Sequence, residues 1–464
     1  MIKIINEMEI LMHPLEKRGG GSPAAEYFSF ALPAIIGMIL TAGIVVVDGI
    51  FIGRAIGSAG LASVNLTLPV FHVFLGITIM VSVGGAVKSS RLLGQKKAGE
   101  AGSVFAGTLV LSVLSTVVLL ILLVIFFEPV MGLIRAGGEL YDLCRSYFSV
   151  IRWFYPVMML NISLSVFVRT AGRPELSLVF GLMGNVLNII LDYLLIMRFN
   201  MGLSGAAAAS GVSVTIPLLC SVLFFKSGKS SLSFGKLRLS GRLVAGIFAN
   251  GSSEMIGQLS VTISVWLFNA IVLKRLGVDG LAAYTIVSYF IMLQGMVLTG
   301  LATGLGPVCG YHFGAGHHER LVKILKTALA AGFAAGILGW LIVILCGRPA
   351  AAFFSGGNAE VVRIAAGSYT VFTAAFLING FNLLTSGFLT SLGRARASFV
   401  VAALRGLVLN TAALLIFPVL FGDQGIWWTF PVAEALTFLA ALPMLAAALR
   451  SLTCGIPGTA SARS

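Results

Sequence analysis

The chain has 464 residues, of which 58% are hydrophobic and only 10% are charged, and its mean hydropathy is +1.00. Globular domains carry about 25% charged residues, so this composition excludes a soluble fold and indicates a protein of the lipid bilayer. The net charge of +14 would suggest a nucleic-acid partner in a soluble protein. In a membrane protein, the placement of the basic residues along the chain determines what this charge means.

Long apolar runs recur along the whole chain. Each run has roughly 20 to 25 residues and can cross a hydrocarbon core of about 30 Å as a helix, whereas barrel strands would show about 10 residues of alternating polarity. We therefore expect an all-α polytopic membrane protein with twelve transmembrane helices in two pseudo-symmetric six-helix bundles. The expected spans are residues 28–52, 61–87, 103–127, 147–168, 175–197, 204–225, 244–272, 281–305, 328–346, 366–389, 399–420 and 425–448.

The basic residues predict the orientation of these spans. With both termini in the cytoplasm, the termini, the even-numbered loops and their flanking helix ends hold most of the Lys and Arg residues, Arg405 among them. The positive-inside rule thus predicts a multi-pass protein of the plasma membrane with cytoplasmic termini, and no nucleic-acid partner is needed.

A polar, basic segment between the sixth and seventh spans divides the chain. The expected organisation is a cytoplasmic segment 1–26, a first lobe 27–225, a basic linker 226–242, a second lobe 243–448 and a cytoplasmic tail 449–464. Residues 1–25 lack a long apolar segment, so we expect no cleavable signal peptide. Five scattered cysteines have no metal-type spacing, and we expect no cofactor, with a monomer as the working form.

The two halves contain a repeat. A shift of 220 residues superposes Gly57, Gly60, Gly84 and Gly94 on Gly277, Gly280, Gly304 and Gly314, and a shift of 221 superposes Phe167, Gly172 and Arg173 on Phe388, Gly393 and Arg394. Six helices separate the units, so the halves are parallel, as in transporters whose two bundles rock about a site between them. Glycine clusters can also recur because small residues let helices approach closely.

Four carboxylates fall inside the expected spans: Asp48, Asp192, Glu254 and Glu434. An ionisable group in hydrocarbon costs several kcal/mol unless it is paired or faces a wet cavity, so each is a candidate functional residue. The repeat does not duplicate them, because the counterparts of Asp48 and Asp192 lie near Phe268 and Ala413.

The first half offers a polar cluster near the outer surface. Asp48 and Asp192 should lie at similar depth, within about 10 Å of the outer interface. The predicted cation-coupling site consists of Asp48, Asn188, Asp192, Tyr147 and Ser210. Their oxygens are hard ligands for Na⁺, and two nearby carboxylates raise one another's proton affinity, so H⁺ is the other candidate. Alternatively, Asp48 caps the first helix or pairs with Arg54.

The second half offers a candidate substrate cavity, predicted to include Glu254, Gln258, Asn379, Asn382 and Glu434. Glu254 should lie close to mid-bilayer, where it can meet a lipophilic cation or hydrogen-bond Gln258. Glu434 follows Pro431 and could line the same cavity or bond the carbonyl groups freed by that proline.

Two further residues in the first two spans are candidates for a structural or functional role. His72 fits a hydrogen-bonded structural residue better than a proton relay. Pro33 lies four turns before Asp48 and interrupts the helical ladder, so it is a candidate hinge or a static kink.

Several segments resemble the multidrug and toxic compound extrusion (MATE) family. They are VVVDGIFIGRAIGSAGLASVNLTLP from Val45, GNVLNIILDYLLI from Gly184, MGLSGAAAAS from Met201 and GPVCGYHFGAG from Gly306. The last departs from the family at Gly306, where glutamine is common. The resemblance extends over residues 27–448.

The resemblance implies a two-lobed exporter that exchanges H⁺ or Na⁺ for cationic amphipathic compounds. It assigns the cation site to Asp48, Asn188 and Asp192, with Tyr147 and Ser210 matching by spacing. Glu254 matches an acid of one branch, but that branch also has an aspartate in the tenth helix, where this chain has Asn379 and Asn382. The resemblance therefore favours an ion site in the first lobe.

Three other functions are open to a chain of this composition. A lipid-linked precursor flippase of the same superfamily would need a cationic central cavity, whereas the acids inside these spans are the more prominent charges. An intramembrane enzyme would need a metal motif or a nucleophile with a base, and no HExxH occurs. A channel would not need two lobes that rock against each other, and the repeat indicates such lobes.

Overall fold

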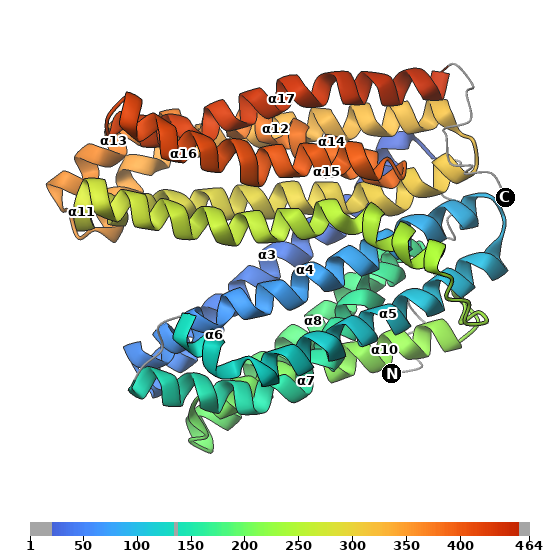
Figure 1. The fold of residues 1–464 in the computed structure, drawn as a ribbon, viewed down its shortest axis with the longest axis horizontal. Coiled ribbons are helices and arrows are strands. Elements are labelled where there is room, and N and C mark those ends of the chain that lie inside the picture. The colour runs from blue at the N-terminus through green and yellow to red at the C-terminus, as the bar shows by residue number, and fades with distance from the viewer. Residues whose placement is uncertain (1–20, 134–137, 454–464) are drawn as a thin grey trace.

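The structure is a computed structural model that describes residues 21–133 and 138–453. The chain forms two helical bundles that follow one another in sequence (Figure 1). The first bundle comprises α3 (Pro23–Ala55), α4 (Ser58–Gly94), α5 (Ala98–Ile125), α6 (Phe127–Leu133), α7 (Glu139–Thr170), α8 (Pro174–Asp192), the π-helical turn η2 (Tyr193–Arg198), α9 (Gly202–Ser213) and α10 (Thr215–Lys226). The second comprises α11 (Gly241–Gly314), α12 (His318–Phe354), α13 (Ala359–Thr373), α14 (Phe376–Ser391), α15 (Ala395–Ala403), the π-helical turn η3 (Leu404–Val408), α16 (Leu409–Leu420) and α17 (Gln424–Thr453).

The twelve expected spans correspond to 11 long apolar helical segments in the described residues, because the seventh and eighth spans are continuous in α11. α11 has 74 residues, and as a straight helix it would be about 110 Å long, far more than a bilayer. Its helix is interrupted at Gly277, which has φ 67° and ψ −160°, and Figure 1 shows its two arms running alongside each other. The expected all-α fold is confirmed.

The glycines of the repeat make equivalent turns in the two halves. Gly57 lies between α3 and α4 with φ 85° and ψ −163°, nearly the conformation of Gly277. Side chains rarely adopt such positive φ values, so both turns require glycine. The sequence repeat is therefore a repeat of backbone geometry.

The same repeat builds the contact between the two bundles. A Cβ atom at Gly94 of α4 would lie 2.1 Å from the carbonyl oxygen of Tyr311, and a Cβ atom at Gly314 of α11 would lie 2.1 Å from the carbonyl oxygen of Arg91. Gly94 and Gly314 are equivalent in the repeat, and so are Arg91 and Tyr311. The two contacts are therefore symmetric. Helices can cross this closely only where a side chain is missing.

The bundles touch at one end of the molecule. We call this the linker end, because it carries residues 227–240 between α10 and α11, and we call the opposite end, which carries α6 and α13, the far end. In Figure 1 the bundles converge toward the linker end and diverge toward the far end. Close contacts join Gly84 to Ile247 and Gly251 to Met80 in the half nearer the linker.

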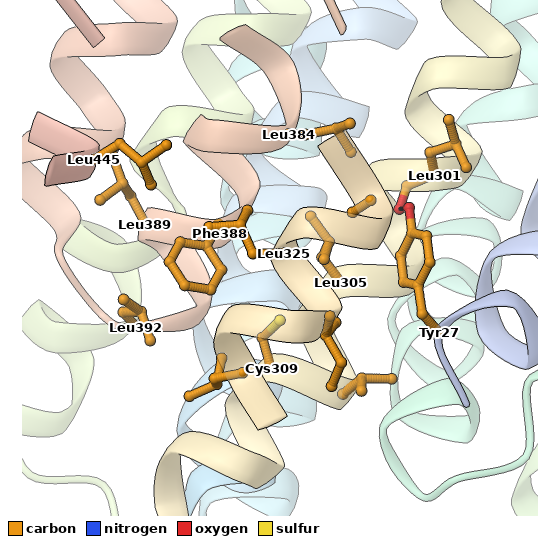
Figure 2. Close-up of a cluster of buried hydrophobic side chains, with 14 of the residues drawn as sticks. Tyr27, Leu301, Leu305, Cys309, Leu325, Leu384, Phe388, Leu389, Leu392 and Leu445 are labelled. Carbon is orange, nitrogen blue, oxygen red and sulfur yellow. Dashed lines mark hydrogen bonds between the residues drawn. The ribbon is translucent and has the colours of Figure 1, made fainter. Parts of the chain in front are cut away.

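Helix α3 reaches both bundles. Its first turns pack into the core of the second bundle, where Tyr27 donates a hydrogen bond of 2.9 Å to the carbonyl oxygen of Leu301. Figure 2 shows Tyr27 beside Leu301 and Leu305 in this core. The later turns of α3 face α8 and η2 of the first bundle, and Pro33 lies inside the helix near the change of partner.

Most helices extend beyond the expected spans, by as much as ten residues at the start of α12, which begins at His318 where the span was expected from residue 328. The first helix begins at Pro23, where the Ser22 hydroxyl accepts a hydrogen bond of 3.1 Å from the Ala25 backbone N–H. Such a cap lets the helix begin in the polar interface, before the apolar run that marks the span. Residues 1–20 and 454–464, which hold most of the expected cytoplasmic segment and tail, lie outside the described residues.

We predict that Gly94→Ala destabilises the protein by about 1–3 kcal/mol, because the added methyl group must push the crossing helices apart. Thermal unfolding of the purified protein in detergent would measure the loss. Gly246→Ala is the matched control, since a Cβ atom there has no neighbour within 4 Å. An equal effect of both substitutions would contradict the close crossing.

Candidate functional site

The first bundle holds two acids against each other. Asp192 lies on the last turn of α8 with 0% of its surface exposed, and Asp48 is half-buried on α3. Their carboxylates are close enough to interact directly. Even so, Oδ1 of Asp48 and both carboxylate oxygens of Asp192 have no hydrogen-bond partner among the described residues. No described Lys or Arg forms an ion pair with either acid, and the expected alternative of a pair with Arg54 does not occur.

The local sequence explains why these groups point inward. Phe180, Gly184, Asn188 and Asp192 follow one another at intervals of four, so they form one buried face of α8. Asn188 is 8% exposed, and its Nδ2 also lacks a partner among the described residues. Directly after Asp192 the helix widens into the π-helical turn η2, a feature that is frequent at functional sites.

Two hydroxyl groups were expected to complete this cluster. Tyr147 of α7 lies within electrostatic reach of both Asp48 and Asp192, as its predicted role requires. Ser210 is half-buried on α9, and its hydroxyl makes no hydrogen bond to the other members within the described chain. The structure therefore brings Asp48, Asp192 and Tyr147 together and shows no bond that joins Ser210 to them.

This unpaired set of oxygens fits a small cation. A buried carboxylate without a partner is strongly disfavoured unless it takes up a proton or binds a cation. Asp48 and Asp192 could each hold H⁺, or their oxygens could hold Na⁺ together. The residues present thus fit either coupling ion.

The second bundle fills the equivalent place with aromatic rings. Phe268, the counterpart of Asp48, stacks on Tyr284 with ring centroids 5.1 Å apart and an interplanar angle of 4°. Phe372 and Trp427 extend this buried cluster, with centroids 5.7 Å apart. The duplicated fold therefore has a cluster of polar side chains in one bundle and an apolar cluster at the equivalent place in the other.

Glu434 has partners that the sequence did not indicate. Its side chain on α17 is 1% exposed, and it accepts hydrogen bonds of 2.9 Å from Arg405 Nε and 2.6 Å from Asn382 Nδ2. Sequence reasoning placed Arg405 among the cations near the cytoplasmic surface; in the structure it lies on η3 and pairs with the buried carboxylate of Glu434. Asn379 is 4% exposed, and its Oδ1 has no partner in the described part of the chain.

Glu254 lies apart from that pair. It is half-buried on α11, one turn from Gly251 and Gln258, both of which face α4 of the first bundle. No hydrogen bond joins Glu254 to Gln258 in the described residues. Glu254 therefore lies beside the contact between the bundles, where a ligand held by both could reach it.

His72 also lies at this contact. Its Nδ1 shares a hydrogen bond of 2.9 Å with Thr262 Oγ1, which joins α4 to α11. This bond agrees with the structural role favoured by the sequence.

A comparison with models of protein families identifies the family of the chain. Residues 33–194 and 255–415 match the family model described as MatE, and together they make up well over half of the chain. The chain belongs to the MatE family. It is therefore a multi-pass membrane transporter and not an enzyme, and the family predicted from the sequence is confirmed. Asp48, Asn188 and Asp192 lie in the first matched segment, and Glu434 lies outside both.

Curated relatives of this MatE chain are named as exporters. Multidrug export protein MepA of Staphylococcus saprophyticus is 27% identical over 415 residues, which cover 89% of this chain and 91% of the relative. The protein of the same name from Staphylococcus aureus strain N315 is 26% identical over 416 residues, with the same coverage of both chains.

Solved structures share the whole fold. One, described as the outward-facing conformation of a multidrug resistance MATE family transporter of the MOP superfamily, has a TM-score of 0.86 at 21% identity and covers 94% of this chain and 97% of that chain. A MATE protein in a bent conformation has a TM-score of 0.87 at 21% identity, with the same coverage. At this identity the likeness establishes the fold, including the twelve helices.

We predict that Arg405→Gln destabilises this MatE protein by about 3–5 kcal/mol, because it leaves the buried carboxylate of Glu434 without its cation. Thermal unfolding in detergent would measure the effect. Arg405→Gln with Glu434→Gln should recover most of the loss, since the double change removes both charges. Arg363→Gln is the control, because it breaks an exposed pair with Glu360 and should hardly change stability. A similar response to Arg405→Gln and Arg363→Gln would contradict the interior pair.

Proposed function

We propose that this protein is a secondary active multidrug exporter that exchanges H⁺ or Na⁺ for cationic amphipathic compounds by alternating access. The observation that carries the proposal is the pair of buried Asp192 and half-buried Asp48, which has no cationic partner among the described residues. The names of the curated relatives support the export of drugs, and the two-bundle fold supports alternating access.

Cation uptake in the first lobe supplies the coupling. An ionised Asp48–Asp192 pair carries uncompensated negative charge, and a bound proton or Na⁺ neutralises one unit of it. A ligand shifts a conformational equilibrium only by the difference between its affinities for the two states. The coupling ion therefore binds more tightly to the conformation that releases the drug, with Tyr147 beside both carboxylates as a further ligand.

The positive-inside prediction indicates which side of the membrane each end of the molecule faces. If the linker end faces the cytoplasm, the described conformation is closed toward the cytoplasm and its bundles diverge toward the outside. The drug is then released at the far end while the coupling ion enters there. We assign the protein to the plasma membrane on the same charge distribution.

The substrate meets the protein between the lobes. Glu254 lies beside the contact of α4 and α11 and forms no ion pair in the described residues, so it is the acid best placed to attract a cationic compound. Glu434 and Asn382 are bonded to each other within the second lobe, and we assign them a structural role. Apolar surfaces of α4 and α11 would bind the hydrophobic part of such a compound.

A buried charge cluster closes the linker end. Glu26 of α3 is 4% exposed and accepts hydrogen bonds of 2.8 Å from Arg320 Nε and 2.7 Å from Arg320 Nη2, and it shares one of 2.9 Å with His312 Nε2. Arg91 of α4 donates to the carbonyl oxygen of Leu392 and stacks over the Phe313 ring. Both sets join helices of the first bundle, α3 and α4, to the second bundle, so we expect them to loosen when this end opens. Sequence reasoning missed Glu26, since an acid in a first helical turn is common.

We predict that Asp48→Asn and Asp192→Asn each abolish ion-driven efflux, because an amide cannot take up a proton at neutral pH and brings no negative charge to hold Na⁺. Ethidium efflux from proteoliposomes, with pH and Na⁺ gradients imposed separately, would measure this and identify the ion. Asp142→Asn, an exposed acid of α7, is the control and should transport normally. Normal gradient-driven efflux in both first-lobe variants would falsify the proposed coupling site.

We predict that Glu26→Gln increases the population that is open at the linker end, because it weakens charged hydrogen bonds worth about 1.5–3 kcal/mol each. Spin labels at Lys97→Cys and Glu319→Cys, in a cysteine-free background, would report the separation by electron paramagnetic resonance. Glu360→Gln removes an exposed acid at the far end and should leave the distances unchanged. Identical distance distributions with and without Glu26→Gln would show that this cluster does not hold the end shut.

A further inference from the structure

The segment between the two lobes follows a fixed path at the linker end. We call residues 227–240 the strap. Leu232 is 0% exposed within the core of the first bundle, and Ser231 Oγ donates a hydrogen bond of 3.1 Å to the carbonyl oxygen of Ala171. The backbone N–H of Gly235 donates to the carbonyl oxygen of Gly102 on α5 at 3.2 Å. These anchors hold the strap against the first bundle without regular secondary structure.

The strap and its flanks concentrate positive charge. They contain Lys226, Lys229, Lys236, Arg238 and Arg242, and no acid occurs from residue 226 to residue 253. The side chains of Lys236 and Arg238 are exposed, and neither forms an ion pair within the described chain. The charges of Lys236 and Arg238 are therefore not compensated by acids of the described chain.

Apolar side chains alternate with these cations. Leu237 is 55% exposed, Phe234 is 44% exposed and Leu239 is 39% exposed. The strap connects the ends of two membrane-spanning helices, α10 and α11, so it lies at the level of the membrane–water interface. An anchored segment with cations and apolar groups at that level has the composition of a lipid-headgroup contact.

We propose that the strap binds anionic phospholipid headgroups. Lys236 and Arg238 contact the phosphates, and Leu237 enters the boundary between headgroups and acyl chains. A soluble anion would be attracted by the same charges, but it would gain nothing from the exposed leucines. The inference does not depend on the proposed transport function, because it concerns binding alone.

The test uses the full-length protein in dodecyl maltoside micelles that contain either phosphatidylglycerol or phosphatidylcholine. The readout is the thermal unfolding midpoint as lipid is titrated, because a ligand of the folded state raises it. We expect phosphatidylglycerol to raise the midpoint more than phosphatidylcholine. Lys236→Gln with Arg238→Gln should weaken the apparent affinity for phosphatidylglycerol on the order of tenfold or more.

A control variant removes two charges elsewhere. Lys274→Gln with Arg348→Gln, exposed cations of the far end, should keep the full preference for phosphatidylglycerol. Equal loss in both double variants, or no loss in the strap variant, overturns the proposal. If the strap variant does not fold, the wild-type preference must still disappear at high salt and shrink with Leu237→Gln. A midpoint raised equally by glycerol phosphate would indicate a soluble anion and would also overturn it.

Discussion

Hydrocarbon offers a carboxylate no water, so each acid inside the membrane must obtain a compensating charge from somewhere. The two lobes meet this constraint differently. Glu434 is held by Arg405 and Asn382, all three from the second lobe. Asp48 and Asp192 have no such partner among the described residues. The second lobe therefore pairs Glu434 internally, whereas under the proposed function the acids of the first lobe take their cation from solution.

The repeat explains how one lobe can be specialised in this way. Gly57 and Gly277 make the same turn, and Gly94 and Gly314 make reciprocal contacts where the lobes cross. These positions fix backbone geometry and tolerate little change. The lobe interiors are free to differ, and Phe268 stacks on Tyr284 where the first lobe has Asp48. The two lobes are thus alike in the backbone contacts that position their helices and differ in the side chains of their interiors.

The sequence was sufficient for features that depend on periodicity or on rare residues. Apolar runs predicted the spans, glycines predicted the repeat, and the rarity of acids in apolar helices led to Asp48 and Asp192. Other features depend on which residues meet in space. Arg405, which pairs with Glu434, lies on the π-helical turn η3, and such a turn has no clear sequence signature. The cluster of Glu26, His312 and Arg320 joins residues almost 300 positions apart. One amino-acid sequence alone gives no sign of such a contact.

Helix α3 connects the candidate cation site to both lobes. The helix begins with Glu26 and Tyr27 bonded to the second lobe and carries Asp48 beside Asp192 of the first. A helix transmits force along its hydrogen-bonded ladder, and Pro33 removes one bond of that ladder between the two attachments. A change in the position of Asp48 on cation uptake must therefore either bend α3 near Pro33 or pull on the contacts of Glu26 and Tyr27. Under the proposed function, both responses connect the charge of the first lobe to the closed end of the molecule without a second ion site.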